Sequence, residues 1–316
     1  MHVKSLLLAV LVVFLTNTGL FAEEKLQIFV SILPQKYFVE RITGDLAEVS
    51  VLVSPGKSPT TYSPTPAQVK TLASADVYFR IGVSFENGFM HKIASIAPGI
   101  RVVDTRKGIA LRKMEGHIHE EDHQKTHGHA HDGKTDPHHE GEEDEIHDHA
   151  DMSSGKDPHI WMSPMLVNQQ AATMTEILIE LAPVHEARFQ ENYEAFSQDL
   201  NQLHERLRII LEPMSGGNFF VFHPAFGYFA DAYSLNQIPV ETMGRSPKGK
   251  ELSAIIKLAR QEKARVIFVQ PQFDQQSARK IAEAIDGAVV SINPLAPDYL
   301  DNMVRMADTI ATALAR

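Results

Sequence analysis

A long amphipathic segment near the middle of the chain most constrains the fold. From Pro183 to Leu211, apolar side chains recur at steps of four and three residues, which places them on one face of an α-helix. This stripe consists of Phe189, Tyr193, Phe196, Leu200, Leu203, Leu207 and Ile210. Roughly 30 residues at about 1.5 Å each make a rod of about 45 Å. Such a rod is long enough to join two lobes and would limit their relative motion.

Short β-prone runs alternate with helical patterns on both sides of this segment. The runs lie near residues 26–33, 49–53, 77–81 and 101–103 before it, and near 219–222, 237–240, 266–269 and 288–292 after it. This alternation is typical of βαβ units with parallel strands. We therefore expect an α/β protein with two βα lobes joined by a long rigid helix and a ligand site in the cleft between them. The expected boundaries are 23–182 for the N-terminal lobe, 183–213 for the linking helix and 214–316 for the C-terminal lobe.

The first residues resemble a secretory signal peptide. Lys4 precedes an apolar run over residues 5–15, and small residues end at Ala22 before Glu23. The run is too short to span a membrane, and no later run reaches spanning length. The chain of 316 residues contains no cysteine, which excludes disulfides, thiolate ligands and a lipid-anchored cysteine after the signal. We expect cleavage near Ala22 and export of the mature protein, most simply into a periplasm.

A second conspicuous segment, residues 115–151, is crowded with histidine and carboxylate. Its histidines are His117, His119, His123, His127, His129, His131, His138, His139, His147 and His149. Because almost nothing apolar is available for burial, the sequence predicts a mobile loop. Neutral imidazoles beside carboxylates form weak, exchangeable sites for divalent ions. We therefore expect this histidine tract to collect metal with low affinity.

The formal net charge of −10 belongs almost entirely to this tract. The tract holds 13 acidic and 2 basic residues, so the totals of 40 and 30 leave 27 acidic and 28 basic residues for the rest of the chain. A nearly neutral remainder without a basic face gives no indication of a nucleic-acid partner.

Polar residues at strand ends predict a fixed metal site beside this collector. His159 follows Pro158 and precedes Ser163-Pro164, a pattern typical of a helix N-cap with proline at the first helical position, which would hold it on rigid scaffold. His223, Gln270 and Asn293 each follow a predicted strand of the C-terminal lobe. In open α/β sheets ligands bind beyond the carboxyl ends of strands. We expect His159 and His223 to meet across the cleft, whereas His91, His185 and His204 lie in helical patterns and are interpreted as solvated or structural.

These motifs together resemble the zinc- and manganese-binding substrate-binding proteins of metal ABC importers, the ZnuA-like family. The likeness covers essentially the whole mature chain. Besides the histidine tract, it rests on Tyr62-Ser63-Pro64-Thr65-Pro66, Asp157-Pro158-His159-Ile160-Trp161, His223-Pro224-Ala225-Phe226-Gly227-Tyr228, Val269-Gln270-Pro271-Gln272-Phe273 and Asn293-Pro294-Leu295. The resemblance implies metal held between two lobes and delivered to a membrane permease with its ATPase. We expect the protein itself to be a monomer without enzymatic activity.

The chain departs from the family pattern at two positions. The family's first histidine ligand, between a proline and the tyrosine, corresponds to Thr60, and its C-terminal aspartate corresponds to Asn293. The expected ligands are therefore His159, His223 and the amide oxygen of Asn293, while Thr60 and Gln270 are degenerate or supporting positions. Zinc suits two imidazoles with oxygen donors best. Manganese prefers carboxylate-rich sites and is disfavoured, and nickel or copper remain alternatives.

Two other functions are compatible with the same residues. Two histidines with open metal positions resemble the site of a zinc enzyme, although Asn293, the best placed residue, cannot act as a general base. The protein could also be a metal buffer or an adhesion protein with no transport step. An adjacent permease and ATPase in the genome would favour import over buffering.

The composition of the histidine tract generates a first testable prediction. Deletion of residues 116–150 is expected to lower the number of metal ions bound per chain and to leave one tight site. The reason is that it removes the ten imidazoles that form the weak sites. Competitive zinc titration measures both quantities. Loss of the tight site in the same variant would show that the tract supplies a direct ligand.

Overall fold

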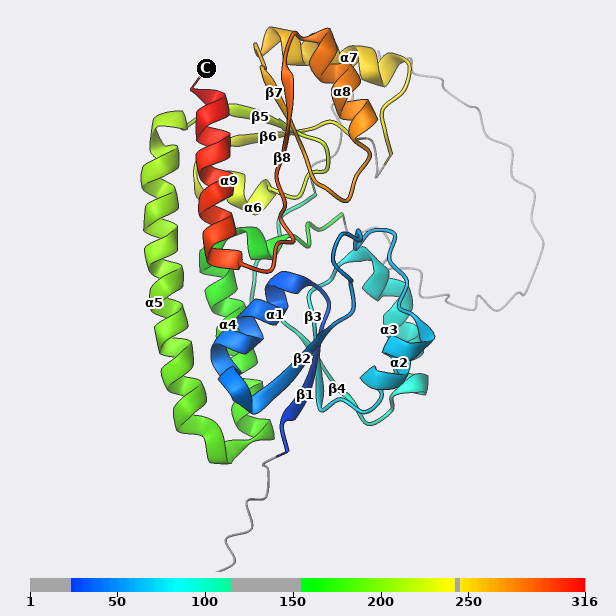
Figure 1. Cartoon of the computed structure of the whole chain (residues 1–316), viewed down its shortest axis with the longest axis vertical. Helices are drawn as coiled ribbons and strands as arrows, with labels where there is room; N and C mark the ends of the chain where they lie inside the picture. Colours follow the sequence, from blue (N-terminus) through cyan, green and yellow to red (C-terminus); the bar gives the residue numbers. More distant parts are fainter. Residues whose placement is uncertain (1–23, 115–154, 242–244, 316) are drawn as a thin grey trace, which may run out of the picture.

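The computed structural model describes residues 24–114, 155–241 and 245–315. The predicted signal peptide and the histidine tract lie outside these residues. Two α/β lobes are stacked along the long axis of the molecule, and one long helix runs beside both of them (Figure 1). This arrangement confirms the predicted fold class.

The N-terminal lobe is a parallel sheet flanked by helices. Its strands are β1 (Leu26–Val30), β2 (Ala47–Val51), β3 (Val77–Arg80) and β4 (Arg101–Asp104), in the order β2-β1-β3-β4. Helices α1 (Leu33–Thr43), α2 (Pro66–Leu72) and α3 (Ser84–Ile96) connect them. The last three residues of β1 and the first three of β3 are buried, as expected where helices cover both faces of a parallel sheet.

The C-terminal lobe repeats the same topology. Strands β5 (Asn218–Val221), β6 (Asn236–Pro239), β7 (Val266–Val269) and β8 (Ala288–Ser291) are parallel, in the order β6-β5-β7-β8. The intervening helices are α6 (Gly227–Ala232), α7 (Lys250–Gln261) and α8 (Gln275–Ala284). In each lobe the second strand lies on one side of the first strand, and the third strand lies on the other side. This is the switch point at which such sheets open a crevice for ligands.

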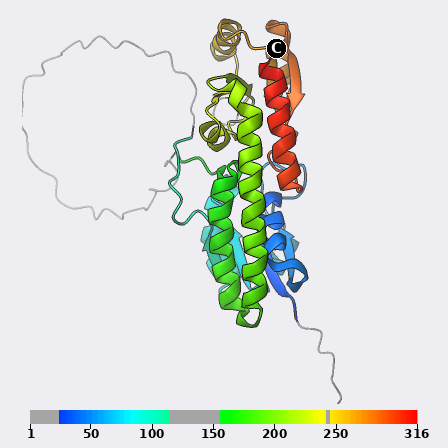
Figure 2. The same ribbon diagram turned by 90° about the vertical axis from the view of Figure 1, so that its left-hand side faces the viewer.

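Three helices form a spine beside the two sheets. They are α4 (Pro164–Leu181), α5 (Glu186–Leu211) and α9 (Tyr299–Leu314). Figure 2 shows α5 flanked by α4 along the N-terminal lobe and by α9 along the C-terminal lobe, and both helices contact α5. The buried face of α5 consists of Phe189, Phe196, Leu200, Leu203, Leu207 and Leu211. The predicted stripe is therefore correct, except that Tyr193 and Ile210 are only partly buried.

The linking helix begins slightly later than the sequence pattern predicts. Residues Pro183–His185 form a 3₁₀ turn, and the α-helix starts at Glu186. The chain must reverse there between α4 and α5, and a tighter turn achieves this reversal within a few residues.

One apolar core runs through both lobes. It includes buried residues of β1 and β3, the inner faces of α4, α5 and α9, and Phe219 and Val221 of β5. A smaller core lies between the C-terminal sheet and α7 and α8. The continuity of the larger core fixes one sheet relative to the other, because core packing is dense and resists shear. None of the helices in the described ranges has the length and apolar composition needed to cross a membrane.

Candidate metal centre

His159 lies in a short segment that tertiary contacts hold at the lobe boundary. Residues 157–159 lead into a 3₁₀ turn at Ile160–Met162, after which Ser163 and Pro164 begin α4. Ser163 occupies the N-cap position and Pro164 the first helical position, although the serine side chain makes no capping hydrogen bond. This agrees with the predicted pattern. The His159 residue is only 7% exposed.

A carboxylate orients the ring of His159. Asp157 Oδ1 accepts the backbone N–H of His159 at 2.9 Å and lies 2.7 Å from its Nδ1. Arg112 Nη1 lies 3.4 Å from the other oxygen of the fully buried Asp157. The imidazole is thereby fixed with Nδ1 towards the carboxylate and Nε2 towards the cleft.

His223 lies two residues beyond the end of strand β5 and is equally well supported. Its backbone N–H donates to Gln270 Oε1 at 3.2 Å, and Gln270 Nε2 donates to the carbonyl of His223 at 2.6 Å. Glu241 Oε1 lies 2.7 Å from Nδ1, and the ring of Phe273 stacks on the imidazole with centroids 4.7 Å apart. Gln270 therefore positions the backbone of His223.

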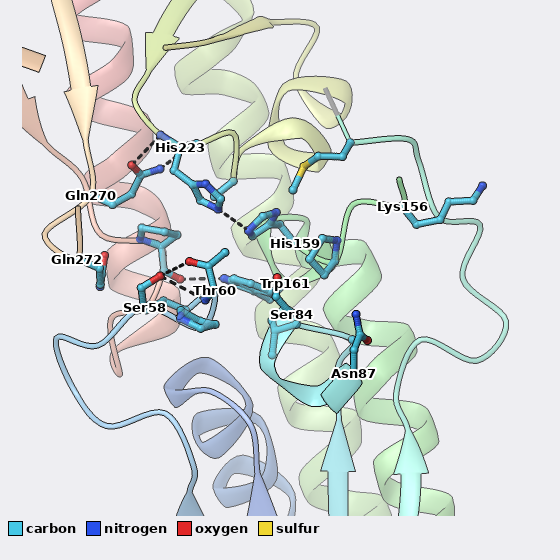
Figure 3. Close-up of a pocket in the computed structure, with 18 of the residues that line it drawn as sticks. Ser58, Thr60, Ser84, Asn87, Lys156, His159, Trp161, His223, Gln270 and Gln272 are labelled. Carbon is cyan, nitrogen blue, oxygen red and sulfur yellow. Dashed lines mark hydrogen bonds between the residues drawn. The ribbon is translucent and has the colours of Figure 1, made fainter. Parts of the chain in front are cut away.

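The two imidazoles face each other across the boundary between the lobes. Their Nε2 atoms are 3.3 Å apart, as the dashed line in Figure 3 marks. Two nitrogens bound to one zinc ion at about 2.0–2.1 Å, with a tetrahedral angle of about 109°, are separated by about 3.3–3.4 Å. His159 and His223 therefore lie close together, at a separation that a shared zinc ion would fit.

The carboxylates also determine which nitrogen of each neutral ring carries the proton. A carboxylate only accepts hydrogen bonds, so Nδ1 must donate in both rings. Both Nε2 lone pairs then face the same gap, and neither neutral ring has a proton to place between them. Only an imidazolium or a bound cation can satisfy this arrangement.

The pKa directions favour a neutral His223 and an ionised Asp157. Burial lowers the pKa of His223 below 6.5, and His159 adds to this effect, which outweighs the opposing influence of Glu241. Burial alone would raise the pKa of Asp157. Hydrogen bonds and charge from His159, together with Arg112, nevertheless hold the pKa of Asp157 below its ordinary value.

The histidines line a cavity of about 620 Å³ between the lobes. Thr60 lies on its wall, next to Ser58, with which its hydroxyl is hydrogen-bonded (Figure 3). Gln270 also lines the cavity, but Asn293 is not among its lining residues. The amide oxygen of Asn293 accepts hydrogen bonds from Gln272 Nε2 and from the backbone N–H of Leu295, at 2.9 and 3.1 Å. Both lone pairs of that oxygen are used, so this orientation does not offer it to a metal.

Hydrogen bonds with residues of the C-terminal half of the chain hold the His159 segment in place. Trp161 Nε1 donates to the carbonyl of Pro294 at 2.9 Å, and the hydroxyl of Tyr299 donates to the carbonyl of Trp161 at 2.7 Å. Tyr228 donates to the carbonyl of Asp157 at 2.9 Å, and burial raises the pKa of this tyrosine to about 12, which keeps its proton in place. His159 is therefore anchored to the lobe that carries His223.

Two supporting residues are absent from the sequence-based site. Asp157 lies within the motif that contains His159, and its position two residues before the histidine is the signal that could have identified it. Glu241 closely follows β6, so the strand-end argument applied to His223 could have found it as well. In the described ranges, no cluster of three or more His, Cys, Asp or Glu side chains is arranged to hold a metal.

The three other described histidines lie away from this centre. His91 is exposed on α3, the ring of His185 contacts Phe189, and His204 Nδ1 lies 3.2 Å from the hydroxyl of Tyr233. These positions agree with their interpretation as solvated or structural residues.

Comparison with known proteins identifies the family. The family model described as "Zinc-uptake complex component A periplasmic" matches residues 28–313, nearly the whole described chain. The chain belongs to this family. Its members are substrate-binding proteins of periplasmic zinc uptake rather than enzymes.

Individual relatives and structures agree with this membership. The chain is 28% identical to the high-affinity zinc uptake system protein ZnuA of Haemophilus ducreyi, covering 90% of this chain and 89% of the relative. It is 26% identical to the Yersinia pestis protein of the same name, covering 84% and 81%. A crystal structure of ZnuA superposes with a TM-score of 0.78 at 34% identity, covering 92% of this chain and 99% of the other.

The carboxylates behind the imidazoles generate a testable prediction. Asp157→Asn and Glu241→Gln are each expected to weaken zinc binding by about 10- to 100-fold, because each removes the charge that orients a histidine and raises its basicity. Competitive zinc titration measures the loss, and circular dichroism checks that the variants fold.

Asp231→Asn is the matched control for this prediction. Asp231 is exposed and pairs with Arg112 at 2.9 Å, but it contacts neither histidine. Its substitution is expected to leave zinc affinity close to that of the wild type. Wild-type affinity in both Asp157→Asn and Glu241→Gln would contradict the orienting role.

Proposed function

We propose that this protein captures Zn²⁺ between His159 and His223 and delivers it to the membrane permease of an ABC importer. The observation that carries the proposal is the pair of Nε2 atoms, 3.3 Å apart, each on a ring whose Nδ1 faces a buried carboxylate. This carboxylate–histidine arrangement is typical of metal ligands in proteins. Delivery to a permease is what the zinc-uptake family implies for a periplasmic member.

In this geometry, the two imidazoles are the protein ligands that we propose for the ion. Thr60 can offer only a hydroxyl from the cavity wall, and Asn293 has its oxygen engaged elsewhere. The remaining positions on the ion are therefore left to oxygen donors from outside the described chain. Zinc accepts such a mixed nitrogen and oxygen set, whereas manganese would require more carboxylate oxygen, and nickel or copper are the next candidates.

Capture is favoured over catalysis by the surroundings of the proposed ion. A zinc hydrolase needs a general base within reach of the metal-bound water. Asp157 and Glu241 are the carboxylates behind the two histidines, and each is engaged by an imidazole Nδ1. Within the described ranges, no Asp or Glu lines the cavity itself.

Export and assembly complete the proposal. We expect the signal peptide to be cleaved near Ala22 and the mature chain to act in the periplasm as a monomer. After capture, the loaded protein docks to the permease, which with its ATPase moves the ion across the inner membrane. An adhesion or buffering role without transport would leave zinc uptake unchanged when the gene is deleted.

Removal of either imidazole tests the site directly. His159→Ala and His223→Ala are each expected to abolish the tight zinc site, with a loss of more than about 100-fold, because the ion loses one of two nitrogen ligands. Zinc titration measures affinity, and uptake of labelled zinc by cells tests transport. The variants should also fail to restore uptake in a strain that lacks the gene.

His204→Ala is the control, since His204 lies on α5 and contacts Tyr233 rather than the proposed centre. It is expected to bind zinc and to support uptake like the wild type. An unchanged tight site in the His159→Ala variant would remove this histidine from the proposed centre.

The pH dependence of binding follows from the protonation of the imidazoles. Zinc binds the neutral ring, so protonation competes with the metal. Because the pKa of His223 is lowered from 6.5, its ring stays neutral to more acidic pH than a free histidine. Affinity contributed by His223 should therefore persist at pH 6.5 and decline only below that value. Zinc titration from pH 8 to pH 5 measures the profile, and a flat profile would contradict imidazole ligation.

A further inference from the structure

The two facing histidines need a short mechanical link between the lobes. Their Nε2 atoms are 3.3 Å apart, and two lone pairs at this distance repel each other when no cation lies between them. The backbone that carries each ring must therefore resist separation. The helical spine joins the lobes over a long path through α4, α5 and α9, so a connection nearer to the site would control the distance more directly.

Such a connection begins at His223 itself. Residues 224–227 lead from this histidine to Tyr228, and both Ala225 and Phe226 are buried. Tyr228 belongs to α6, which Figure 1 shows at the boundary between the lobes. The chain after His223 is thus a short, packed arm that carries Tyr228 towards the N-terminal lobe.

The hydroxyl of Tyr228 joins this arm to the segment that carries His159. It donates to the carbonyl of Asp157 at 2.9 Å and accepts the backbone N–H of Arg112 at 3.1 Å. These two segments are also bonded to each other, because the N–H of Asp157 donates to the carbonyl of Arg112 at 3.0 Å. One buried hydroxyl therefore holds two paired backbone segments, two residues before His159.

The side chain of Arg112 closes the same connection. Its Nη1 lies 3.4 Å from Oδ2 of the fully buried Asp157, whose other oxygen lies 2.7 Å from Nδ1 of His159. The guanidinium also lies over the ring of Tyr228, with Cζ 5.9 Å from the ring centroid. Its ion pair with the exposed Asp231 is expected to contribute little, as is usual for a surface pair.

Gly227 provides the space for this guanidinium. A Cβ at Gly227 would overlap Arg112 Nη1 and lie 2.8 Å from Asp157 Oδ2. Any side chain at this position would push the arginine away from the carboxylate. The residues that follow His223 thus include two, Gly227 and Tyr228, that act on the other histidine.

We propose that Tyr228, Arg112 and Gly227 form a clamp that sets the separation of the two imidazoles. The clamp acts on His159 through Asp157, so its members are positioning residues rather than ligands. This inference rests on the proposed function, because the separation matters only if the two rings share an ion. Ligands that are already in place bind more tightly than ligands that must first be brought together, so loosening the clamp lowers zinc affinity.

Three substitutions loosen the clamp without changing the formal charge of the chain. Tyr228→Phe removes the hydroxyl, Gly227→Ala displaces the guanidinium, and Arg112→Lys keeps the cation but loses the planar fork. Tyr228→Phe and Gly227→Ala are each expected to weaken zinc binding by about tenfold, the lower end for groups behind a metal ligand, and Arg112→Lys by less. Zinc titration measures affinity, and thermal unfolding of the zinc-free full chain measures stability separately.

Tyr233→Phe is the matched control. Tyr233 is buried directly after α6, and its hydroxyl lies 3.2 Å from Nδ1 of His204 rather than beside the His159 segment. The same chemical change is expected to leave zinc affinity at the wild-type value. If Gly227→Ala does not fold, the comparison of Tyr228→Phe with Tyr233→Phe still decides the outcome.

Cobalt(II) shows whether the clamp acts on the geometry of the site, because its visible spectrum depends on how the ligands are arranged around the metal. The spectrum of the His159→Ala/His223→Ala double variant is subtracted to remove metal bound elsewhere. We expect Tyr228→Phe to alter the difference spectrum and Tyr233→Phe to leave it unchanged. A loss of stability alone would not alter it.

A double-mutant cycle tests whether Arg112 acts through Asp157. The effect of Arg112→Lys on zinc affinity should largely disappear in the Asp157→Asn background and persist in the Glu241→Gln background, because only coupled residues have non-additive effects. Equal effects in both backgrounds would contradict the action through Asp157.

The outcomes separate the clamp from the proposed function. Suppose that Tyr228→Phe and Arg112→Lys keep the wild-type zinc affinity and cobalt spectrum, while tight binding still depends on both histidines. This result would overturn the clamp and leave zinc capture intact. A double histidine variant that retains the tight site would overturn both proposals.

Discussion

The facing imidazoles of His159 and His223 are the interaction on which the function of this structure depends. Each ring is buried, each has its Nδ1 against a carboxylate, and their Nε2 atoms are 3.3 Å apart. Two lone pairs directed into one gap are unfavourable unless a proton or a cation lies between them. Rigid surroundings hold the two rings in this arrangement, so the ligands need little reorganisation when a metal ion binds.

The spine of helices explains how the two lobes can keep the Nε2 atoms of His159 and His223 so close together. The apolar core passes from the N-terminal sheet through α4, α5 and α9 to strand β5. Near the site, the Trp161 side chain donates a hydrogen bond to the carbonyl of Pro294, and the Tyr299 hydroxyl donates one to the carbonyl of Trp161, which ties the His159 segment to the C-terminal half. The metal centre is therefore set by packing that extends beyond the cavity, and substitutions in the spine would act on affinity through this geometry.

Charged side chains around the cavity are arranged in pairs. Carboxylates lie behind the imidazoles, and each described arginine that lines the space is paired with a carboxylate, Arg80 with Glu86 and Arg106 with Asp104. Negative charge is thus placed where it orients the two imidazoles and where it neutralises the arginines.

The sequence by itself determined the two βα lobes, the linking helix and the pair of histidines, because hydrophobic periodicity and strand-end position are local properties of the chain. It also predicted that Gln270 follows a strand of the lobe that carries His223. The tertiary structure decided the rest. Asn293 follows a strand as predicted, but Gln272 and Leu295 occupy its oxygen, whereas Glu241 becomes a partner of His223 from 18 residues away. Side-chain partners of this kind depend on the packing of separate elements, which no local pattern records.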